Sequence, residues 1–131
     1  MKILVASAHK VERLGVVAVL NSLLVDIVRT VEVDSIGSLF VSTELDKDIE
    51  LLILDLNTPH NGDGERLLAL TSGVSALRVI GLDGGDGDRT FYGKWLGALH
   101  MVSKTSPLVV FADAVLALTD SRLHRIHYGI Y

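Results

Sequence analysis

The sequence predicts an α/β protein in which five parallel strands form one doubly wound sheet flanked by five helices. Three observations lead to this class. Short apolar segments of strand length alternate with longer segments of helical periodicity over most of the 131 residues. Within Leu51–Pro59, an uninterrupted apolar run ends in Asp55, which is typical of a strand buried on both faces. Aromatic residues make up only 5% of the chain, so small aliphatic side chains must fill the core.

Five segments have the length and composition of strands, and turn signals or charges follow them. The segment over 27–33 alternates polar and apolar residues, so we expect it at an edge of the sheet with one solvated face. The predicted strands cover residues 2–6, 27–33, 51–55, 77–82 and 99–102.

The first helix follows the turn at Ser7, whose hydroxyl is a candidate N-cap. Helical spacing predicts a buried face on this helix. A short second helix is followed by a charged connector over 44–50, and two further helices are predicted over 65–71 and 89–96. The expected apolar positions are Val11, Leu14, Val17 or Ala18, and Val25 in the first helix, and Ile36, Leu39, Phe40 and Thr43 in the second.

The last helix begins at Ser106-Pro107, with Ser106 as the predicted N-cap and Pro107 at the first helical position. Its expected buried face consists of Val110 or Phe111, Ala114, Val115 and Leu118.

Length and composition limit the functions that are open to the chain. We expect a single domain over 1–120, followed by a tail or helix extension over 121–131. A net charge of −4 argues against direct nucleic-acid binding, and the absence of cysteine excludes disulfides and thiolate metal sites. No apolar run is long enough to cross a membrane, so a cytoplasmic location is expected.

Candidate functional residues gather at one edge of the predicted sheet. At this size the natural strand order is the flavodoxin-like 2-1-3-4-5, in which the carboxyl ends of the first, third and fifth strands lie along the same edge of the sheet. This order brings together Ser7-Ala8, Asp55 and Lys104, with Asp83 alongside. Ligands bind at such an edge. Asp55 is therefore a candidate for chemistry, although a carboxylate that caps the next turn is the alternative.

With these residues in place, the chain resembles the receiver domain of two-component response regulators, the CheY-like family. The resemblance spans roughly residues 1–120 and is greatest to receivers of LuxR-type DNA-binding regulators. It is carried by the opening turn and first helix over 6–15, by Leu54–Pro59, by Gly97-Ala98 with Ser103-Lys104, and by Ser106-Pro107. The resemblance implies that Asp55 stands at the phosphoacceptor position and Lys104 at the position of the conserved cation.

The chain departs from this family in three features: the acidic pair, the switch hydroxyl and the switch aromatic. The acidic pair that holds Mg²⁺ is replaced by Ser7 and Ala8, which carry no carboxylate. The switch hydroxyl is replaced by Asp83, and the switch aromatic by Met101. We therefore predict a pseudo-receiver without a cofactor, in which an Asp55–Lys104–Asp83 cluster replaces the phosphorylation site. Alternatively, Asp83 belongs to a solvated loop.

Two other functions stay open at this point. One is a working phosphoacceptor that is phosphorylated on Asp55 by a histidine kinase, controls transcription, and uses Mg²⁺ held by relocated ligands such as Asp83, Asp86 or Asp88. The other is a small-ligand-binding module that uses the vacated pocket.

The aromatic residues of the fourth predicted helix suggest where a partner would bind. Phe91 and Trp95 are four residues apart and share a face, so Tyr92 points elsewhere. We expect Tyr92, Trp95 and His100 to contribute to an interaction face on the fourth helix, fifth strand and last helix. A protein partner or a second copy of the chain is expected there, and no enzymatic activity is predicted.

Overall fold

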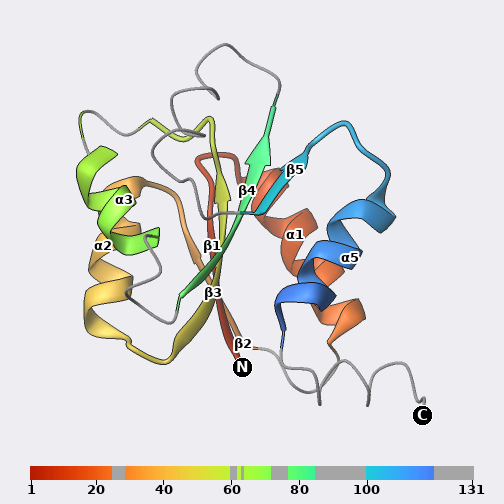
Figure 1. Cartoon of the computed structure of the whole chain (residues 1–131), viewed down its shortest axis with the longest axis horizontal. Helices are drawn as coiled ribbons and strands as arrows, with labels where there is room; N and C mark the ends of the chain where they lie inside the picture. Colours follow the sequence, from red (N-terminus) through yellow and green to blue (C-terminus); the bar gives the residue numbers. More distant parts are fainter. Residues whose placement is uncertain (25–28, 60–61, 63, 72–76, 85–99, 120–131) are drawn as a thin grey trace.

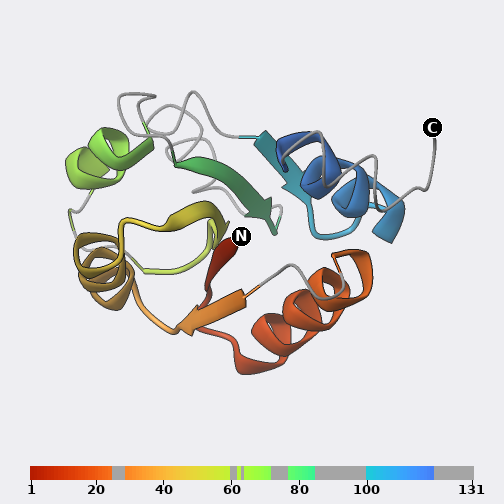
Figure 2. The same ribbon diagram turned by 90° about the horizontal axis from the view of Figure 1, so that it is seen from below.

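A computed structural model describes residues 1–24, 29–59, 62, 64–71, 77–84 and 100–119. Their strands form one parallel sheet that lies between two pairs of helices (Figures 1 and 2). The strands are β1 Lys2–Ala6, β2 Arg29–Val33, β3 Ile49–Asp55, β4 Arg78–Asp83 and β5 His100–Ser103. The helices are α1 Lys10–Leu23, α2 Ile36–Leu45, α3 Gly64–Thr71 and α5 Leu108–Leu118.

The sheet has the order β2-β1-β3-β4-β5, and every neighbouring pair of strands is parallel. The predicted fold class and strand order are therefore confirmed, as is the edge position of β2. Four helices are described, and the fourth predicted helix, over 89–96, lies outside the described residues. The tail over 121–131 also lies outside them.

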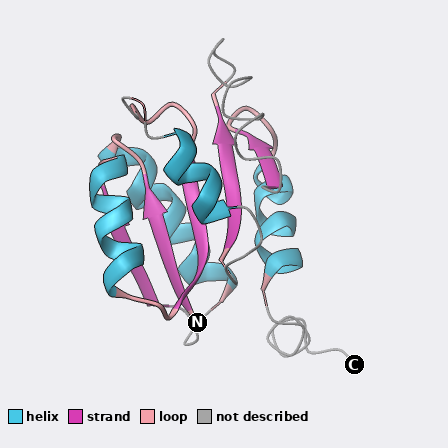
Figure 3. Ribbon diagram, turned by 60° about the vertical axis from the view of Figure 1, so that its left-hand side comes forward, coloured by secondary structure: helices cyan, strands magenta, loops and turns pink. Residues whose placement is uncertain are grey.

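Helices cover both faces of the sheet (Figure 3). Strand alternation divides the core into two layers, one on each face. In β3, Leu51 and Ile53 face α1 and α5, whereas Leu52 and Leu54 face α2 and α3. The first layer is completed by Ile3, Val5, Leu20, Leu24, Ile80, Leu82, Val102, Phe111, Ala114, Val115 and Leu116. The second is completed by Leu4, Ala6, Ile36, Leu39, Phe40, Ile49, Leu56, Leu67 and Val79.

The buried face predicted for α1 is wrong in its first half. Val11 is 84% exposed and Leu14 is 51% exposed, whereas Leu20 is fully buried. Val16 and Val19 are partly buried against the core. Apolar residues occur on every side of this helix, so their spacing does not reveal which side meets the sheet. The packing of α1 beside α5 decides its rotation.

The helix starts also differ from prediction. The N-cap of α1 is His9, and that of α5 is Pro107, one residue later than expected. Ser7 and Ser106 use their hydroxyls elsewhere: the hydroxyl of Ser106 donates to the carbonyl of Ser103 at 2.6 Å. A side-chain cap is present in α2, where Ser35 accepts from the N–H of Ser38 at 3.1 Å.

Several predicted boundaries shift by one or two residues. The connector over 44–50 is shorter than expected, because α2 continues to Leu45 and β3 begins at Ile49. Asp46 in this connector forms an ion pair with Lys2, which ties the connector to β1. The strand β4 includes Asp83, which the sequence placed at the start of a loop. Among the described helices, none is long and apolar enough to span a membrane.

Candidate functional site

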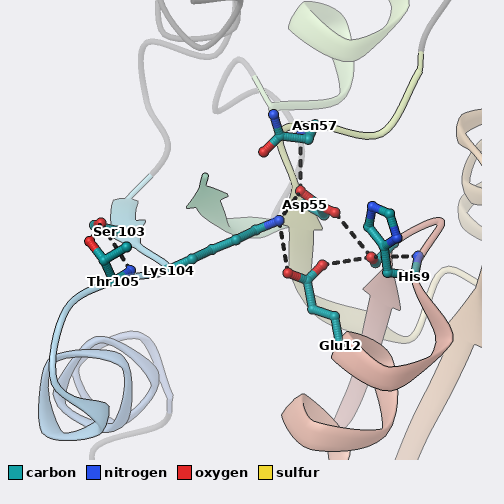
Figure 4. A network of polar contacts seen from close by, with 8 residues as sticks. His9, Glu12, Asp55, Asn57, Ser103, Lys104 and Thr105 are labelled. Carbon is teal, nitrogen blue, oxygen red and sulfur yellow. Dashed lines mark hydrogen bonds and ion pairs between the residues drawn. The ribbon is translucent and has the colours of Figure 1, made fainter. Parts of the chain in front are cut away.

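A partly buried polar cluster lies at the carboxyl edge of the sheet, between β3, the start of α1 and the segment after β5 (Figure 4). The structure brings together three of the predicted positions, Ser7, Asp55 and Lys104. A fourth member, Glu12, comes from the first turn of α1. Sheet order explains the meeting, because β1, β3 and β5 all end at this edge.

Asp55 is the centre of the cluster and is completely buried. One carboxylate oxygen accepts from the backbone N–H of Asn57 at 2.9 Å and from the Lys104 ammonium at 2.8 Å. The other oxygen accepts from the Ser7 hydroxyl at 3.1 Å. Burial raises the pKa of the Asp55 carboxyl, but its contacts with Glu12, Lys104 and the Asn57 N–H outweigh burial and hold the pKa below its ordinary value.

Lys104 bridges two carboxylates. Its ammonium lies 2.8 Å from an oxygen of Asp55 and 2.8 Å from an oxygen of Glu12. Partial burial lowers the pKa of Lys104, but the hydrogen bonds to Asp55 and Glu12 prevail and raise the pKa above its ordinary value. The ammonium therefore stays charged.

Glu12 is the functional residue that sequence reasoning missed. One of its carboxylate oxygens contacts Lys104, and the other accepts from the Ser7 hydroxyl at 2.6 Å. A sequence signal was available: Glu12 follows Ala8 by four residues, about one helical turn. An acidic side chain in the first turn of a helix also points toward the same edge of the sheet as the turn that precedes it.

Ser7 completes a closed ring of contacts. Its hydroxyl lies between the carboxylates of Asp55 and Glu12, and it accepts from the backbone N–H of His9 at 3.1 Å. The Ser7 carbonyl accepts from the Arg13 guanidinium at 2.6 Å. Ser7 is 1% exposed, so this turn is held firmly on both its backbone and its side chain. Ser7 thus belongs to the site rather than to a helix cap.

Asp83 does not take the position that we predicted for it. Within the described part of the chain, the ion pairs of Lys104 are with Asp55 and Glu12, and Asp83 contacts Lys104 through its backbone carbonyl, which accepts from the Lys104 N–H at 2.9 Å. Strand alternation gives the reason. Successive side chains of a strand point to opposite faces of the sheet. Asp55 is two residues after Ile53 and so lies on the face toward α1, whereas Asp83 is four residues after Val79 and so lies on the face toward α2 and α3.

The residues of this site do not fit a magnesium ion. Ser7 and Ala8 supply no carboxylate, and both carboxylates that are present already face the Lys104 ammonium. In the described ranges, no three His, Cys, Asp or Glu side chains come together as a metal site. The relocated ligands considered above, Asp86 and Asp88, lie outside these ranges.

The remaining predicted positions are only partly described. Met101, at the switch aromatic position, is 41% exposed, and His100 beside it is also exposed. Tyr92 and Trp95 lie outside the described residues.

An apolar hollow of about 320 Å³ adjoins the cluster between α1 and the start of α5. Its lining includes Glu12 and Lys104 from the cluster. Most of its wall is apolar and is provided by Val16, Val19, Leu82, Val102, Leu108 and Phe111.

Comparison with known proteins identifies this architecture. No protein-family model matches the sequence, and a search of curated proteins gives no match. Solved structures do match. The isolated REC domain of RcsB from Salmonella enterica serovar Typhimurium, in the presence of the phosphomimetic BeF3−, superposes with a TM-score of 0.73 at 20% identity and covers 90% of this chain and 87% of that one. The chain has the receiver-domain fold.

Two further receivers agree with this result. The signal receiver domain of a response regulator from Bermanella marisrubri has a TM-score of 0.72 at 15% identity and covers 91% of this chain and 98% of that one. The Vibrio cholerae chemotaxis protein CheY4 has a TM-score of 0.68 at 16% identity, with coverages of 90% and 98%. At these low identities the superpositions show the CheY-like fold alone. The chemistry of the site must be argued from the residues of this chain.

Proposed function

We propose that this receiver fold is an atypical receiver domain, which acts in signal transduction through protein contacts and without Mg²⁺-dependent phosphorylation. One observation carries the proposal: Asp55 lies in a closed ring with Ser7, Glu12 and Lys104, in which no carboxylate is left to hold a metal ion. We further propose that the domain is not an enzyme, needs no cofactor and acts in the cytoplasm.

Phosphoryl transfer to Asp55 would face two obstacles. The carboxylate would have to give up donors from Asn57, Lys104 or Ser7 before it could attack phosphorus. The product would then add negative charge beside Glu12 without a metal ion to neutralise it. Two unit charges 4 Å apart repel by about 4 kcal/mol at an effective dielectric constant near 20.

The output of such a domain requires a surface for a partner. The described part of the predicted interaction face has exposed side chains at His100 and Met101 on β5, and Val110 is exposed on α5. The exposed Leu108 and Val109 line the side of α5 that faces α1 and are therefore not part of this face. Exposed apolar side chains such as Met101 and Val110 favour protein contacts. We therefore propose a protein partner or a second copy of the chain on this face, without direct contact to nucleic acid or membrane.

The proposal is tested by measuring the intact mass after incubation with acetyl phosphate and Mg²⁺, with Asp55→Asn as the control. We expect no phosphate-sized gain in either protein. A gain in the native protein that is absent from Asp55→Asn would show a working phosphoacceptor and overturn the proposal.

A second candidate function has one specific observation in its favour. The Asp55–Lys104 contact at 2.8 Å retains the pair that the family uses for phosphorylation by a histidine kinase. The same mass measurement separates this phosphoacceptor function, with its control of transcription, from the proposed one.

A further inference from the structure

We infer that the Lys104 ammonium is the resident cation of this site and occupies the place that a divalent ion would need. The inference rests on the proposed function, because it gives the reason why the site works without a metal ion. It starts from the two carboxylates that face each other across the edge of the sheet, Asp55 on β3 and Glu12 on α1.

The first argument is the geometry around the ammonium. The two N···O distances are equal at 2.8 Å, so Lys104 bridges the carboxylates rather than pairing with one of them. On the far side, the Ser7 hydroxyl spans the same two carboxylates at 2.6 and 3.1 Å. The ammonium therefore joins the two carboxylates, whereas the single hydrogen of the Ser7 hydroxyl serves one carboxylate at a time, with the shorter contact to Glu12.

The second argument is that Lys104 is positioned from both ends. Its backbone N–H donates to the Asp83 carbonyl, which fixes the residue at the end of β4. Beyond it, the chain makes a tight turn in which the Ser103 carbonyl accepts from both the N–H and the hydroxyl of Ser106. The Ser103 hydroxyl accepts from the N–H of Thr105 at 3.2 Å. These contacts fix the backbone position from which the Lys104 side chain extends toward the two carboxylates.

The third argument concerns what a divalent ion would require. Magnesium binds oxygen ligands at about 2.0–2.1 Å in octahedral geometry and usually through one or two carboxylates. An ion placed between Asp55 and Glu12 would meet the ammonium, which carries charge of the same sign. Glu12 thus supplies a second carboxylate that Ser7 and Ala8 cannot provide, but this carboxylate is paired with the Lys104 ammonium.

The physical consequence is a permanent link between α1 and the segment that follows β5. Glu12 on α1 contacts the Lys104 ammonium directly, and the same ammonium contacts Asp55 at the end of β3 (Figure 4). We expect this link to be insensitive to the concentration of divalent metal ions.

The inference is tested by removing the ammonium and asking whether a metal site appears. Four proteins are titrated with Mn²⁺ and followed by paramagnetic broadening of amide signals in ¹H–¹⁵N NMR spectra. They are the native chain, Lys104→Ala, the double variant Lys104→Ala/Glu12→Gln, and the control Lys47→Ala, which removes an exposed lysine just before β3, at the opposite end of that strand from Asp55.

We expect Lys104→Ala to bind Mn²⁺ at least about tenfold more tightly than the native chain, because a like charge has left the site. The broadening should centre on the amides of Asp55, Asn57 and Glu12. The double variant should lose this binding, and Lys47→Ala should behave as the native chain does.

Three results would overturn the inference: Mn²⁺ binding at the cluster in the native chain, no gain of binding in a folded Lys104→Ala variant, or a gain that survives Glu12→Gln. If Lys104→Ala does not fold, a comparison of the Lys104 ammonium signal in the native chain and in Glu12→Gln decides instead. The ¹⁵N ammonium signal of Lys104 should be slow to exchange and unchanged by Mg²⁺, and it should be lost in Glu12→Gln.

These outcomes are distinct from a failure of the proposed function. Native protein that binds Mn²⁺ but gains no phosphate on Asp55 would overturn only the role of Lys104. Native protein that gains phosphate would overturn the proposed function itself.

Discussion

Replacing Lys104 by Met tests whether the ion pairs of the cluster stabilise the fold. Methionine keeps most of the apolar stem and removes the positive charge, so Asp55 and Glu12 are left facing each other without a cation. Asp55 is fully buried and has no access to solvent that could replace the lost ammonium. We therefore expect Lys104→Met to lower the free energy of unfolding.

The size of the effect follows from the distances. At 2.8 Å and an effective dielectric constant near 20, each ammonium–carboxylate attraction is about 6 kcal/mol before desolvation. Desolvation offsets much of this, and removing one partner of a buried pair costs about 3–5 kcal/mol in practice. The side chains of Lys104 and Glu12 are 26% and 20% exposed, so we expect the low end of that range, about 3 kcal/mol.

Urea unfolding followed by far-UV circular dichroism measures this loss, provided that the slope of the transition does not change. Lys47→Met is the control, because this exposed lysine should change stability by less than about 0.5 kcal/mol. Adding Asp55→Asn to Lys104→Met removes one of the two stranded carboxylates and should recover more than half of the loss. The reasoning fails if Lys104→Met is as stable as the control, or if Asp55→Asn destabilises it further.

The other predictions concern pH, the surface and the core. The depressed pKa of Asp55 contributes stability that is present above about pH 4 and is lost as the pH falls through the folded-state pKa. The raised pKa of Lys104 contributes stability that is lost only as the pH rises above about 10.4. The free energy of unfolding of Asp55→Asn should therefore fall less steeply with acid than that of the native chain. Gly15→Ala should raise the free energy of unfolding by about 0.5–1 kcal/mol, because alanine favours the helix and its methyl group at this position meets nothing within 4 Å. Urea unfolding measures this change, and a lower free energy of unfolding would contradict the prediction. Ile53→Ala should cost about 2–5 kcal/mol, since Ile53 is fully buried in the central strand, and a smaller change would mean that the core closes over the cavity.

The surface of α5 remains a prediction of the proposed function. Replacing the exposed Val110 by Lys should weaken partner binding or self-association while leaving the unfolding free energy within about 0.5 kcal/mol. Analytical ultracentrifugation over a range of concentrations measures self-association directly. If the native protein self-associates and the variant associates equally strongly, this face is not the interface and the proposal loses it.

Local patterns in the chain were enough to predict the sheet. The apolar run that ends in Asp55 and the alternation of 29–33 mark a central and an edge strand, and the structure has them at those places. The same patterns, with the handedness of crossover connections, predict the strand order. Ser7, Asp55 and Lys104 meet because strand ends that share an edge must lie close together.

Tertiary structure decided the features that depend on rotation and parity. The side of α1 that is buried, and hence the direction of Glu12, depends on how the helix packs beside α5, and apolar residues on every side of α1 hide this from the sequence. Which face of the sheet a strand-end side chain points to depends on its register with the core. Asp55 lies on the face toward α1 and Asp83 on the opposite face, so the second carboxylate that pairs with Lys104 belongs to Glu12. A pattern read along the chain shows which residues reach the edge of the sheet, but only packing shows which of them meet.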